Sequence, residues 1–277
     1  MVITKKRINV LGVETGLIEA GDPANQTIVL IHDGGYGSTA DLCWDATIEL
    51  LQNDYHVIAP EMLGWGHTAK MVDFSRSPYD QRIDHLTETF EVLAIQDAIF
   101  IGVSFGGSIV LRAASDLSRP WPMKAAVSVA GSLGINRKPE GVAALTNYEP
   151  TLEDAKKLTS FLVDNVDDYM DHVHKRLENS MIPGHWEAVS APVLKNPKAP
   201  KVEPDNEYPE ALSQIKVPTL FIEGEKDKLL DPGWAEQFAK HTPNGIARVL
   251  DCGHEPNIDN PLLLVNTLKE FFCEVGL

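Results

Sequence analysis

Residues 98–107 read AIFIGVSFGG, and this stretch decides the fold of the chain. Its first part, Ala98–Gly102, is a short apolar run that is typical of a buried parallel strand. The residues from Ser108 to Ala114 predict an apolar helix. Between them stands the pattern G-x-S-x-G, whose glycines permit a sharp strand-to-helix turn that lifts a serine clear of the sheet. A glycine-rich phosphate loop is the alternative for such a pentapeptide, but the flanking strand and helix favour Ser104 as a nucleophile.

Strands and helices alternate on both sides of this turn. The other predicted strands are an opening pair at Arg7–Val13 and Leu17–Ala20, and single strands at Thr27–Ile31, His56–Pro60, Lys124–Ala130, Thr219–Glu223 and Ala247–Leu250. Apolar residues at helical spacing predict helices at Trp44–Gln52, Arg82–Ile95, near Gly233–Lys240 and from about Leu262. This alternation predicts an α/β fold with a mostly parallel, eight-stranded sheet that is flanked by helices.

The stretch from residue 135 to residue 216 differs in composition from the rest of the chain. It is polar and helical, without a buried strand, and it ends in the Pro- and Lys-rich sequence APVLKNPKAPKVEPDNEYP at residues 191–209. We expect residues 1–134 and 217–277 to form one α/β core and residues 135–216 to form an inserted helical cap. Such caps usually cover an active site and shape the access of the substrate.

The composition restricts the partners and the cellular setting. Acidic residues outnumber basic ones by 40 to 24, which gives a formal net charge of −16. This field repels nucleic acid and anionic membrane surfaces, so a small molecule is the expected partner. The three cysteines lie far apart, which excludes a disulfide framework and a zinc ribbon. No signal peptide or membrane-spanning run is visible, so the cytoplasm is expected. The sequence leaves open whether the chain forms a homodimer.

A serine hydroxyl needs a base, and the loops after the last strands offer a base and an acid. In folds built around such a strand–serine–helix turn, the chain order is serine, acid, histidine. His254 stands in a Gly-His turn after the last predicted strand, which separates it from the other histidines. Asp227 stands three residues after Gly224 and is the predicted acid, with Asp231 as the alternative. No cofactor or metal ion is expected, because such a triad needs none.

Two backbone N–H groups must point at the oxyanion that forms on an attacked carbonyl. One is expected from Phe105, the residue after the nucleophile. The other is expected from Gly34, in the loop of residues 31–37 (IHDGGYG), because glycine lets the backbone approach closely. A merely flexible loop is the alternative interpretation of these glycines.

With these residues in place, the chain resembles the α/β-hydrolase superfamily over essentially its whole length, and within it the meta-cleavage product hydrolases. Those enzymes cleave a carbon–carbon bond in vinylogous 1,5-diketones that bacteria make when they open aromatic rings. The resemblance rests on residues 11–16 (LGVETG), 32–35 (HDGG), 56–66 (HVIAPEMLGWG), 106–107 (GG) and 176–188. It implies that Arg176 holds the substrate carboxylate, as a guanidinium can with two hydrogen bonds, and that Gly35 and Val103 lie at the substrate. A surface arginine on a helix is the alternative for Arg176.

The chain departs from the family's pattern at four positions. Val103 and Cys43 stand where the family tends to have asparagine, Glu255 where it has tryptophan, and Asp33 where it has glycine. The expected function is serine-dependent hydrolysis of a small acyl substrate. Cleavage of a C–C bond in a keto or dienoic acid is the first expectation, and ester or lactone hydrolysis is the second. A ligand-binding receptor derived from a hydrolase is the alternative outside catalysis.

Overall fold

The computed structural model describes residues 3–191 and 207–277, and its eight strands form one sheet. The strands are β1 (Thr4–Val10), β2 (Val13–Ala20), β3 (Thr27–Ile31), β4 (His56–Pro60), β5 (Ala98–Val103), β6 (Met123–Val129), β7 (Thr219–Gly224) and β8 (Gly245–Leu250). Their order is β1-β2-β4-β3-β5-β6-β7-β8. Only the β1–β2 and β2–β4 pairs are antiparallel. The predicted eight-stranded, mostly parallel sheet is confirmed.

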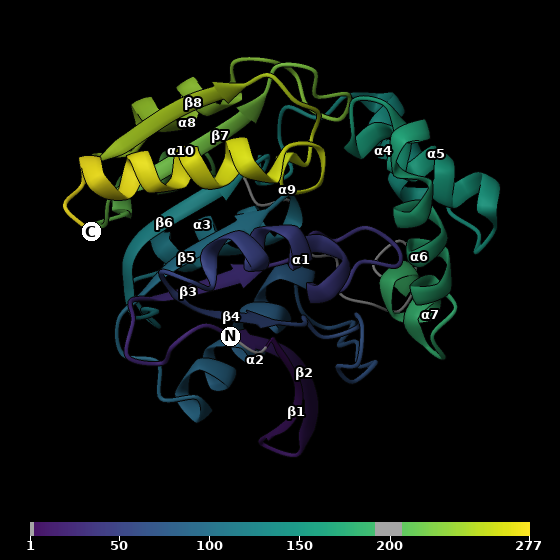
Figure 1. The fold of residues 1–277 in the computed structure, drawn as a ribbon, viewed down its shortest axis with the longest axis horizontal. Helices are drawn as coiled ribbons and strands as arrows, with labels where there is room; N and C mark the ends of the chain where they lie inside the picture. The colour runs from purple at the N-terminus through teal and green to yellow at the C-terminus, as the bar shows by residue number, and fades with distance from the viewer. Residues whose placement is uncertain (1–2, 192–206) are drawn as a thin grey trace.

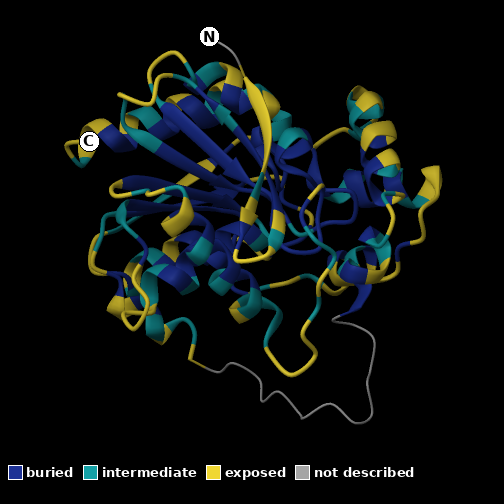
Figure 2. Ribbon diagram, turned by 90° about the horizontal axis from the view of Figure 1, so that it is seen from below, coloured by how far each residue is buried: buried dark blue, intermediate teal, exposed yellow. Residues whose placement is uncertain are grey.

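Helices cover both faces of the sheet (Figure 1). One face packs against α1 (Ala40–Leu51) and α10 (Pro261–Glu274), and the other against α2 (Pro78–Val92), α3 (Phe105–Ser115) and α8 (Trp234–His241), while the short α9 (Pro256–Asp259) lies beside α1 and α10. Figure 2 shows the central strands buried, and β1 at the edge of the sheet and the outer faces of the helices exposed. Because helices cover both faces, strands such as β3 and β5 consist of apolar residues without alternation.

The first hairpin differs from the predicted strand pair. The sequence predicted a first strand that continues to Val13, whereas β1 ends at Val10 and β2 begins at Val13. Leu11 and Gly12 make the turn, with φ of 51° and 91°. Two central residues with positive φ give the turn whose twist matches that of the flanking strands. Leucine is rare in such a turn, so the sequence around Leu11 did not indicate a turn and the first strand was predicted to continue.

Between β6 and β7 the described residues form helices and no strand. They are α4 (Pro139–Thr146), α5 (Leu152–Leu162), η1 (Val166–Tyr169), α6 (Met170–Ser180), α7 (His185–Ser190) and η3 (Glu210–Gln214). Figure 1 shows α4 to α7 grouped on the side to which the arrowheads of the parallel strands point. Residues 192–206, which hold most of the predicted Pro- and Lys-rich sequence, lie outside the described residues.

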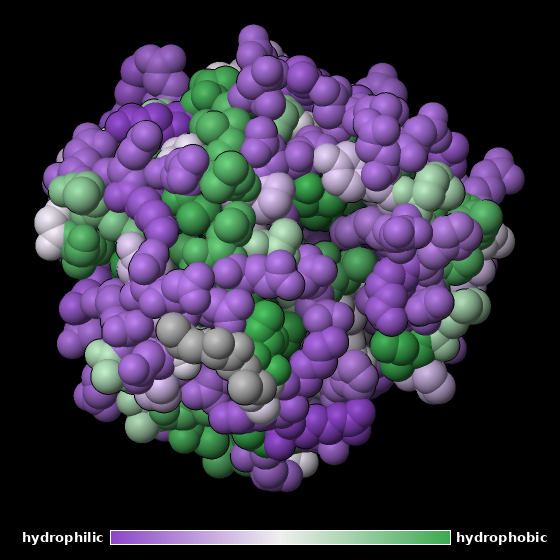
Figure 3. All heavy atoms as spheres, viewed as in Figure 1, coloured by the Kyte–Doolittle hydropathy of each residue, from purple (hydrophilic) through white to green (hydrophobic). Residues whose placement is uncertain are grey.

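The surface is mostly hydrophilic on the face drawn in Figure 1, with apolar side chains gathered in smaller areas (Figure 3). None of the helices in the described part of the chain has the length and apolar character needed to cross a membrane. The carboxyl ends of β3, β5, β7 and β8 meet at one edge of the sheet, since these strands are parallel. Loops at this edge are where ligands bind in open α/β sheets, so the predicted site residues are expected there.

Candidate active site

Ser104 occupies the sharp turn between β5 and α3. Its backbone has φ 54° and ψ −115°, a conformation that a residue with a side chain rarely adopts. The chain holds it there, because the Ser104 N–H donates to the Val129 carbonyl at 2.7 Å and the Ser108 N–H donates to the Ser104 carbonyl at 3.1 Å. A Cβ on Gly102 would lie 2.2 Å from the carbonyl oxygen of Gly106, and one on Gly106 would lie 2.3 Å from that of Ile31. The predicted strand–turn–helix is present, and both glycines are required by its close backbone contacts.

Ser104, His254 and Asp227 form one hydrogen-bonded line. His254 Nε2 lies 2.9 Å from Ser104 Oγ, and His254 Nδ1 lies 2.7 Å from Asp227 Oδ2. The three residues come from the turn after β5, the loop after β7 and the loop after β8. Asp231, the alternative acid, uses its N–H to bind the Asn136 carbonyl at 2.8 Å and is not part of this line. The structure therefore brings together the three residues that the sequence selected.

Asp227 lies in an environment that favours its ionised form. Its Oδ1 accepts hydrogen bonds from the N–H groups of Leu229 at 2.6 Å and Leu230 at 3.1 Å. Burial works to raise the pKa of Asp227, but His254 and these two N–H donors outweigh it and hold the pKa below its ordinary value. An ionised Asp227 keeps the imidazole proton on Nδ1, which leaves Nε2 free to accept a proton from Ser104.

The two residues predicted to supply oxyanion donors lie against each other. A Cβ added to Gly34 would lie 2.7 Å from the Cβ of Phe105, so the loop after β3 touches the first residue of α3. This loop is held in place, because Asp33 accepts from the Gly35 N–H at 2.6 Å and from Ser38 Oγ at 2.5 Å. Backbone N–H groups fixed in this way beside a nucleophile are suited to stabilise a developing oxyanion.

Val103 and Gly35, the other residues expected at the substrate, take different places. The side chain of Val103 is fully buried in the core that α1 and α10 share with the sheet, rather than in a pocket. A Cβ on Gly35 would lie 2.8 Å from Asp33 Oδ1 and 2.9 Å from Arg176 Nη1. Gly35 therefore leaves room for those two charged groups to meet.

Arg176 is fully buried and has a carboxylate partner inside the protein. Its Nη1 lies 3.6 Å from Asp33 Oδ1 and donates a hydrogen bond to the Tyr36 carbonyl at 3.1 Å. Its Nε lies 3.4 Å from Nε2 of His172, whose pKa is lowered to about 3, first by burial and then by Arg176 itself. Burial works against the charge of Arg176, but Asp33 and then Glu255 keep its pKa above the ordinary value.

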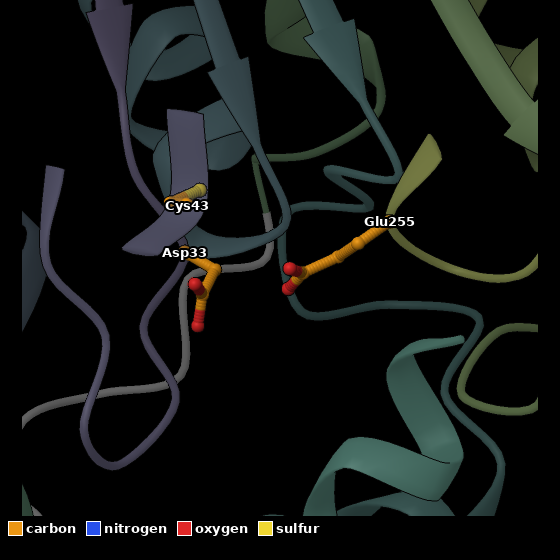
Figure 4. A group of neighbouring side chains, drawn as sticks. All are labelled: Asp33, Cys43 and Glu255. Atoms are coloured by element: carbon orange, nitrogen blue, oxygen red, sulfur yellow. The ribbon is translucent and has the colours of Figure 1, made fainter. Parts of the chain in front are cut away.

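Glu255 and Cys43 complete a buried group around this ion pair. We call Asp33, Cys43, Arg176 and Glu255 the Arg176 cluster. Figure 4 shows the Glu255 carboxylate pointing toward Asp33, with Cys43 on the neighbouring helix. Neither oxygen of Glu255 has a hydrogen-bond partner among the described residues. Burial, and next the charge of Asp33, raise the pKa of Glu255 well above its ordinary value, which favours the protonated carboxyl group. The sequence marks Asp33, Cys43 and Glu255 as departures from the family's pattern and Arg176 as a match to it, but it does not predict that the four residues meet.

Asp33, Cys43 and Glu255 are the group of described residues whose ligand atoms lie close enough to hold a metal ion, within 4.8 Å of one another. Their chemistry does not favour one. Arg176 already places a positive charge beside Asp33, and burial raises the pKa of the Cys43 thiol well above its ordinary value. Metal ligands must be deprotonated, and a neutral thiol and a neutral acid are poor donors. A proton on Glu255 fits this group better than a metal ion.

A small pocket lies beside Ser104 and His254. Its volume is about 20 Å³, which is enough for about one water molecule. The other lining residues come from α3, the segment after β6, α4 and the loop after β7: Ser108, Ala130, Ser132, Arg137, Gly141, Val142, Leu145, Leu229 and Leu230. The pocket thus combines an apolar wall with a few polar groups and one cation next to the hydrogen-bonded line.

Comparisons with known proteins show the family and the fold of the chain. The family model described as "Alpha/beta hydrolase family" matches residues 28–267. A 2-hydroxymuconate semialdehyde hydrolase of Pseudomonas sp. (strain CF600) is 26% identical over 97% of this chain and 94% of its own. A 2-hydroxy-6-oxo-6-(2'-aminophenyl)hexa-2,4-dienoic acid hydrolase of Metapseudomonas resinovorans is 27% identical over 95% of this chain and 89% of its own. The crystal structure of a mutant meta-cleavage product hydrolase superposes with a TM-score of 0.82 at 26% identity, covering 97% of this chain and 98% of that one.

Proposed function

The chain belongs to the alpha/beta hydrolase family, and we propose that it hydrolyses a small acyl substrate with Ser104 as the nucleophile. The observation that carries this proposal is the line from Ser104 Oγ to His254 Nε2 at 2.9 Å and from His254 Nδ1 to Asp227 Oδ2 at 2.7 Å. A nucleophile, a base and an acid in hydrogen-bond reach of one another are the arrangement that acyl transfer needs.

The proposed reaction begins with the attack of Ser104 Oγ on a carbonyl carbon. His254 Nε2 takes the hydroxyl proton, and ionised Asp227 stabilises the imidazolium that forms. The N–H groups of Phe105 and Gly34 hold the oxyanion. When the bond to the leaving group breaks, the imidazolium returns its proton to that group. Water, activated by His254, then releases the acyl group as a carboxylic acid.

Residues 135–216 act in this proposal as a cap over a core made of residues 1–134 and 217–277. Gly141, Val142 and Leu145 of α4 line the pocket at Ser104, and the pocket holds only about one water molecule. A substrate therefore needs α4 to shift when it enters. Closure of such an element afterwards excludes bulk water from the reacting groups.

Two bonds are candidates for cleavage by the same three residues. Cleavage of a C–C bond beside a ketone is the first, supported by the names of the relatives, which cover nearly the whole chain. Hydrolysis of an ester or lactone is the second. The structure favours it through Arg176, because the residue expected to hold a dienoic acid already pairs with Asp33. The products are an acid with a carbon acid in the first case and an acid with an alcohol in the second.

The test is a substrate panel of ring-fission products, aryl esters and lactones, measured with the wild type and with Ser104→Ala. A fluorophosphonate probe on the same proteins reports whether Ser104 is the activated serine. We expect labelling and turnover of at least one substrate class by the wild type, and neither by the variant. Turnover by folded Ser104→Ala at the wild-type rate contradicts the proposal.

A further inference from the structure

Acid substrates pose an electrostatic problem for this protein. With a net charge of −16, the chain repels anions unless a cation is placed locally at the site. Two arginines are candidates for this cation: Arg176 in α6, which the sequence predicted, and Arg137 just before α4, which lines the pocket at Ser104 and His254. The question is which of them is available to a substrate carboxylate.

Arg176 is not available, because its charge is balanced inside the protein. Asp33 lies 3.6 Å from Nη1, and both side chains are almost fully buried. A substrate carboxylate that approached Arg176 would also meet Asp33, an anion that the Gly35 N–H and Ser38 Oγ already stabilise. Two negative charges that lie close together in a buried site repel each other strongly. The carboxyl group of Glu255 beside them adds no positive charge.

Arg137 differs from Arg176 in each of these respects. It lines the pocket that also contains Ser104 and His254, and none of the ion pairs between described residues involves it. Arg82 also lacks a carboxylate partner, but it does not line this pocket and its guanidinium lies over the Trp65 ring, 4.8 Å from the centroid. Arg137 is therefore the arginine that lines the described pocket, and it forms no ion pair with a carboxylate of the described residues.

The backbone fixes Arg137 relative to the proposed catalytic acid. Arg137 forms an isolated β-bridge with Leu230, and the Lys138 N–H donates to the Leu229 carbonyl at 2.9 Å. Leu229 and Leu230 are the residues whose N–H groups bind Asp227, and Lys138 Nζ donates to the Asp227 carbonyl at 2.6 Å. The segment that carries Arg137 is thus tied to the same loop that holds Asp227, and the exposed Arg137 lines the pocket beside Ser104 and His254.

From this arrangement we propose that Arg137, and not Arg176, recognises a carboxylate of the substrate. The inference rests on the proposed function and names its substrate class as a small acyl compound that carries a carboxylate a few bonds from the attacked carbonyl. The planar guanidinium can bind such a group with two parallel hydrogen bonds. Arg137 acts here as a specificity-determining residue, while Arg176 has a structural role.

The experiment compares two esters that differ in one charge, p-nitrophenyl glutarate and its methyl ester. The value of kcat/KM is measured for the wild type and for Arg137→Gln, Arg137→Lys, Arg176→Gln and Arg248→Gln. The last variant removes an exposed charge on β8 and controls for the change in net charge. We expect Arg137→Gln to lower kcat/KM for the acid ester by roughly 10-fold and for the methyl ester by less than about twofold. Arg137→Lys should keep part of the preference, and Arg248→Gln should keep all of it.

Two outcomes overturn the proposal. One is an equal or absent effect of Arg137→Gln on the two esters. The other is a selective loss of the acid ester in Arg176→Gln, which would return the carboxylate to the position that the sequence predicted. If Arg176→Gln does not fold, the Arg137 measurements decide alone.

A second measurement makes the result independent of turnover. Binding of glutarate and of dimethyl glutarate to Ser104→Ala is measured by calorimetry, with and without Arg137→Gln. We expect glutarate to bind roughly 10-fold more weakly without Arg137 and dimethyl glutarate to bind equally. Failure of the proposed function has a different signature, since Ser104 is then not labelled by the fluorophosphonate probe. Labelled, active protein with no selective effect at Arg137 overturns only the inference about Arg137.

Discussion

Two buried carboxyl groups, Asp227, which is bonded to His254, and Glu255, the residue after His254, have pKa values shifted in opposite directions. Asp227 is 7% exposed and accepts hydrogen bonds from His254 and from two backbone N–H groups. Glu255 is 0% exposed and accepts none from the described residues. The pKa of Asp227 is below its ordinary value and the pKa of Glu255 is well above it. At Asp227, the charge of His254 and the hydrogen-bond donors outweigh burial, whereas at Glu255 burial and the charge of Asp33 act in the same direction.

The same contrast separates the two sides of the proposed site. On the side of Asp227, a charge is stabilised next to the base, which prepares His254 to accept a proton. In the Arg176 cluster, Arg176 pairs with Asp33, and the raised pKa of Glu255 favours its neutral form. The surroundings of Asp227 stabilise charge that develops on His254 during a reaction. The Arg176 cluster balances its own charges and has no excess charge.

The largest expected effect is on the side of Asp227, at the nucleophile and the base. Ser104→Ala and His254→Ala should each lower kcat by roughly 10³-fold or more, because the two groups act as one unit. Circular dichroism shows whether each variant is folded, and steady-state kinetics on the best substrate of the panel measure the loss. A double variant that is about as slow as either single variant supports the interpretation that Ser104 and His254 act as one unit. Losses that multiply would contradict it.

The acid is expected to give the next largest effect. Asp227→Asn removes the charge that stabilises the imidazolium, so kcat should fall by roughly 10²-fold or more while KM changes little. Asp231→Asn is the matched control in the same loop and should cost less than about threefold. If kinetics show Asp231 as the more sensitive position, the assignment of the acid is wrong.

Breaking the Arg176 cluster should affect stability rather than the chemical step. Arg176→Gln leaves Asp33 as a buried charge without its cation, which costs about 3 kcal/mol of unfolding free energy. Urea denaturation measures this loss. Adding Asp33→Asn to the same protein removes the stranded charge and should recover much of it, as a double-mutant cycle shows. Losses that simply add would mean that the two side chains are not coupled.

A smaller effect is expected from Glu255, and it depends on pH. Since the pKa of Glu255 is raised in the folded state, its contribution to stability is fully present below the unfolded pKa of about 4.3 and is lost as the pH rises through the folded value. Glu255→Gln cannot ionise, so it should gain stability relative to the wild type as the pH is raised from 4 to 9. Thermal unfolding at each pH measures the difference, and a constant difference across this range argues against a protonated Glu255.

The smallest expected effect is that of removing metal ions. Exhaustive chelation should change kcat by less than about twofold, because neither the proposed triad nor the neutral groups of the Arg176 cluster need a cation. Activity after dialysis against a chelator is compared with activity after zinc or manganese is added back. Loss with chelation and rescue by one of these ions would show that Asp33, Cys43 and Glu255 bind metal.

Much of the fold and of the triad could be predicted from the sequence because the signals are local. Strands β3 and β4 occupy the predicted residues, since strands buried on both faces appear as short apolar runs. The pattern around Ser104 specifies a turn through glycines that nothing larger could replace. The chain order of parallel strands brings the loops of Asp227 and His254 to the same edge as Ser104, so their meeting follows from the topology.

What only the tertiary structure decided is how the charged residues pair. Asp33 and Arg176 stand in the loop after β3 and in α6, and no local pattern relates a loop residue to a helix residue so far along the chain. From the sequence, Arg176 was predicted to bind a substrate carboxylate. In the folded protein it pairs with the carboxylate of Asp33 instead. Likewise, Arg137 carries no motif, and its place at the pocket depends on a backbone bridge to Leu230 across the insertion. Short-range patterns of hydrophobicity fix secondary structure, but the pairing of buried charges depends on distances that exist only after the chain has folded.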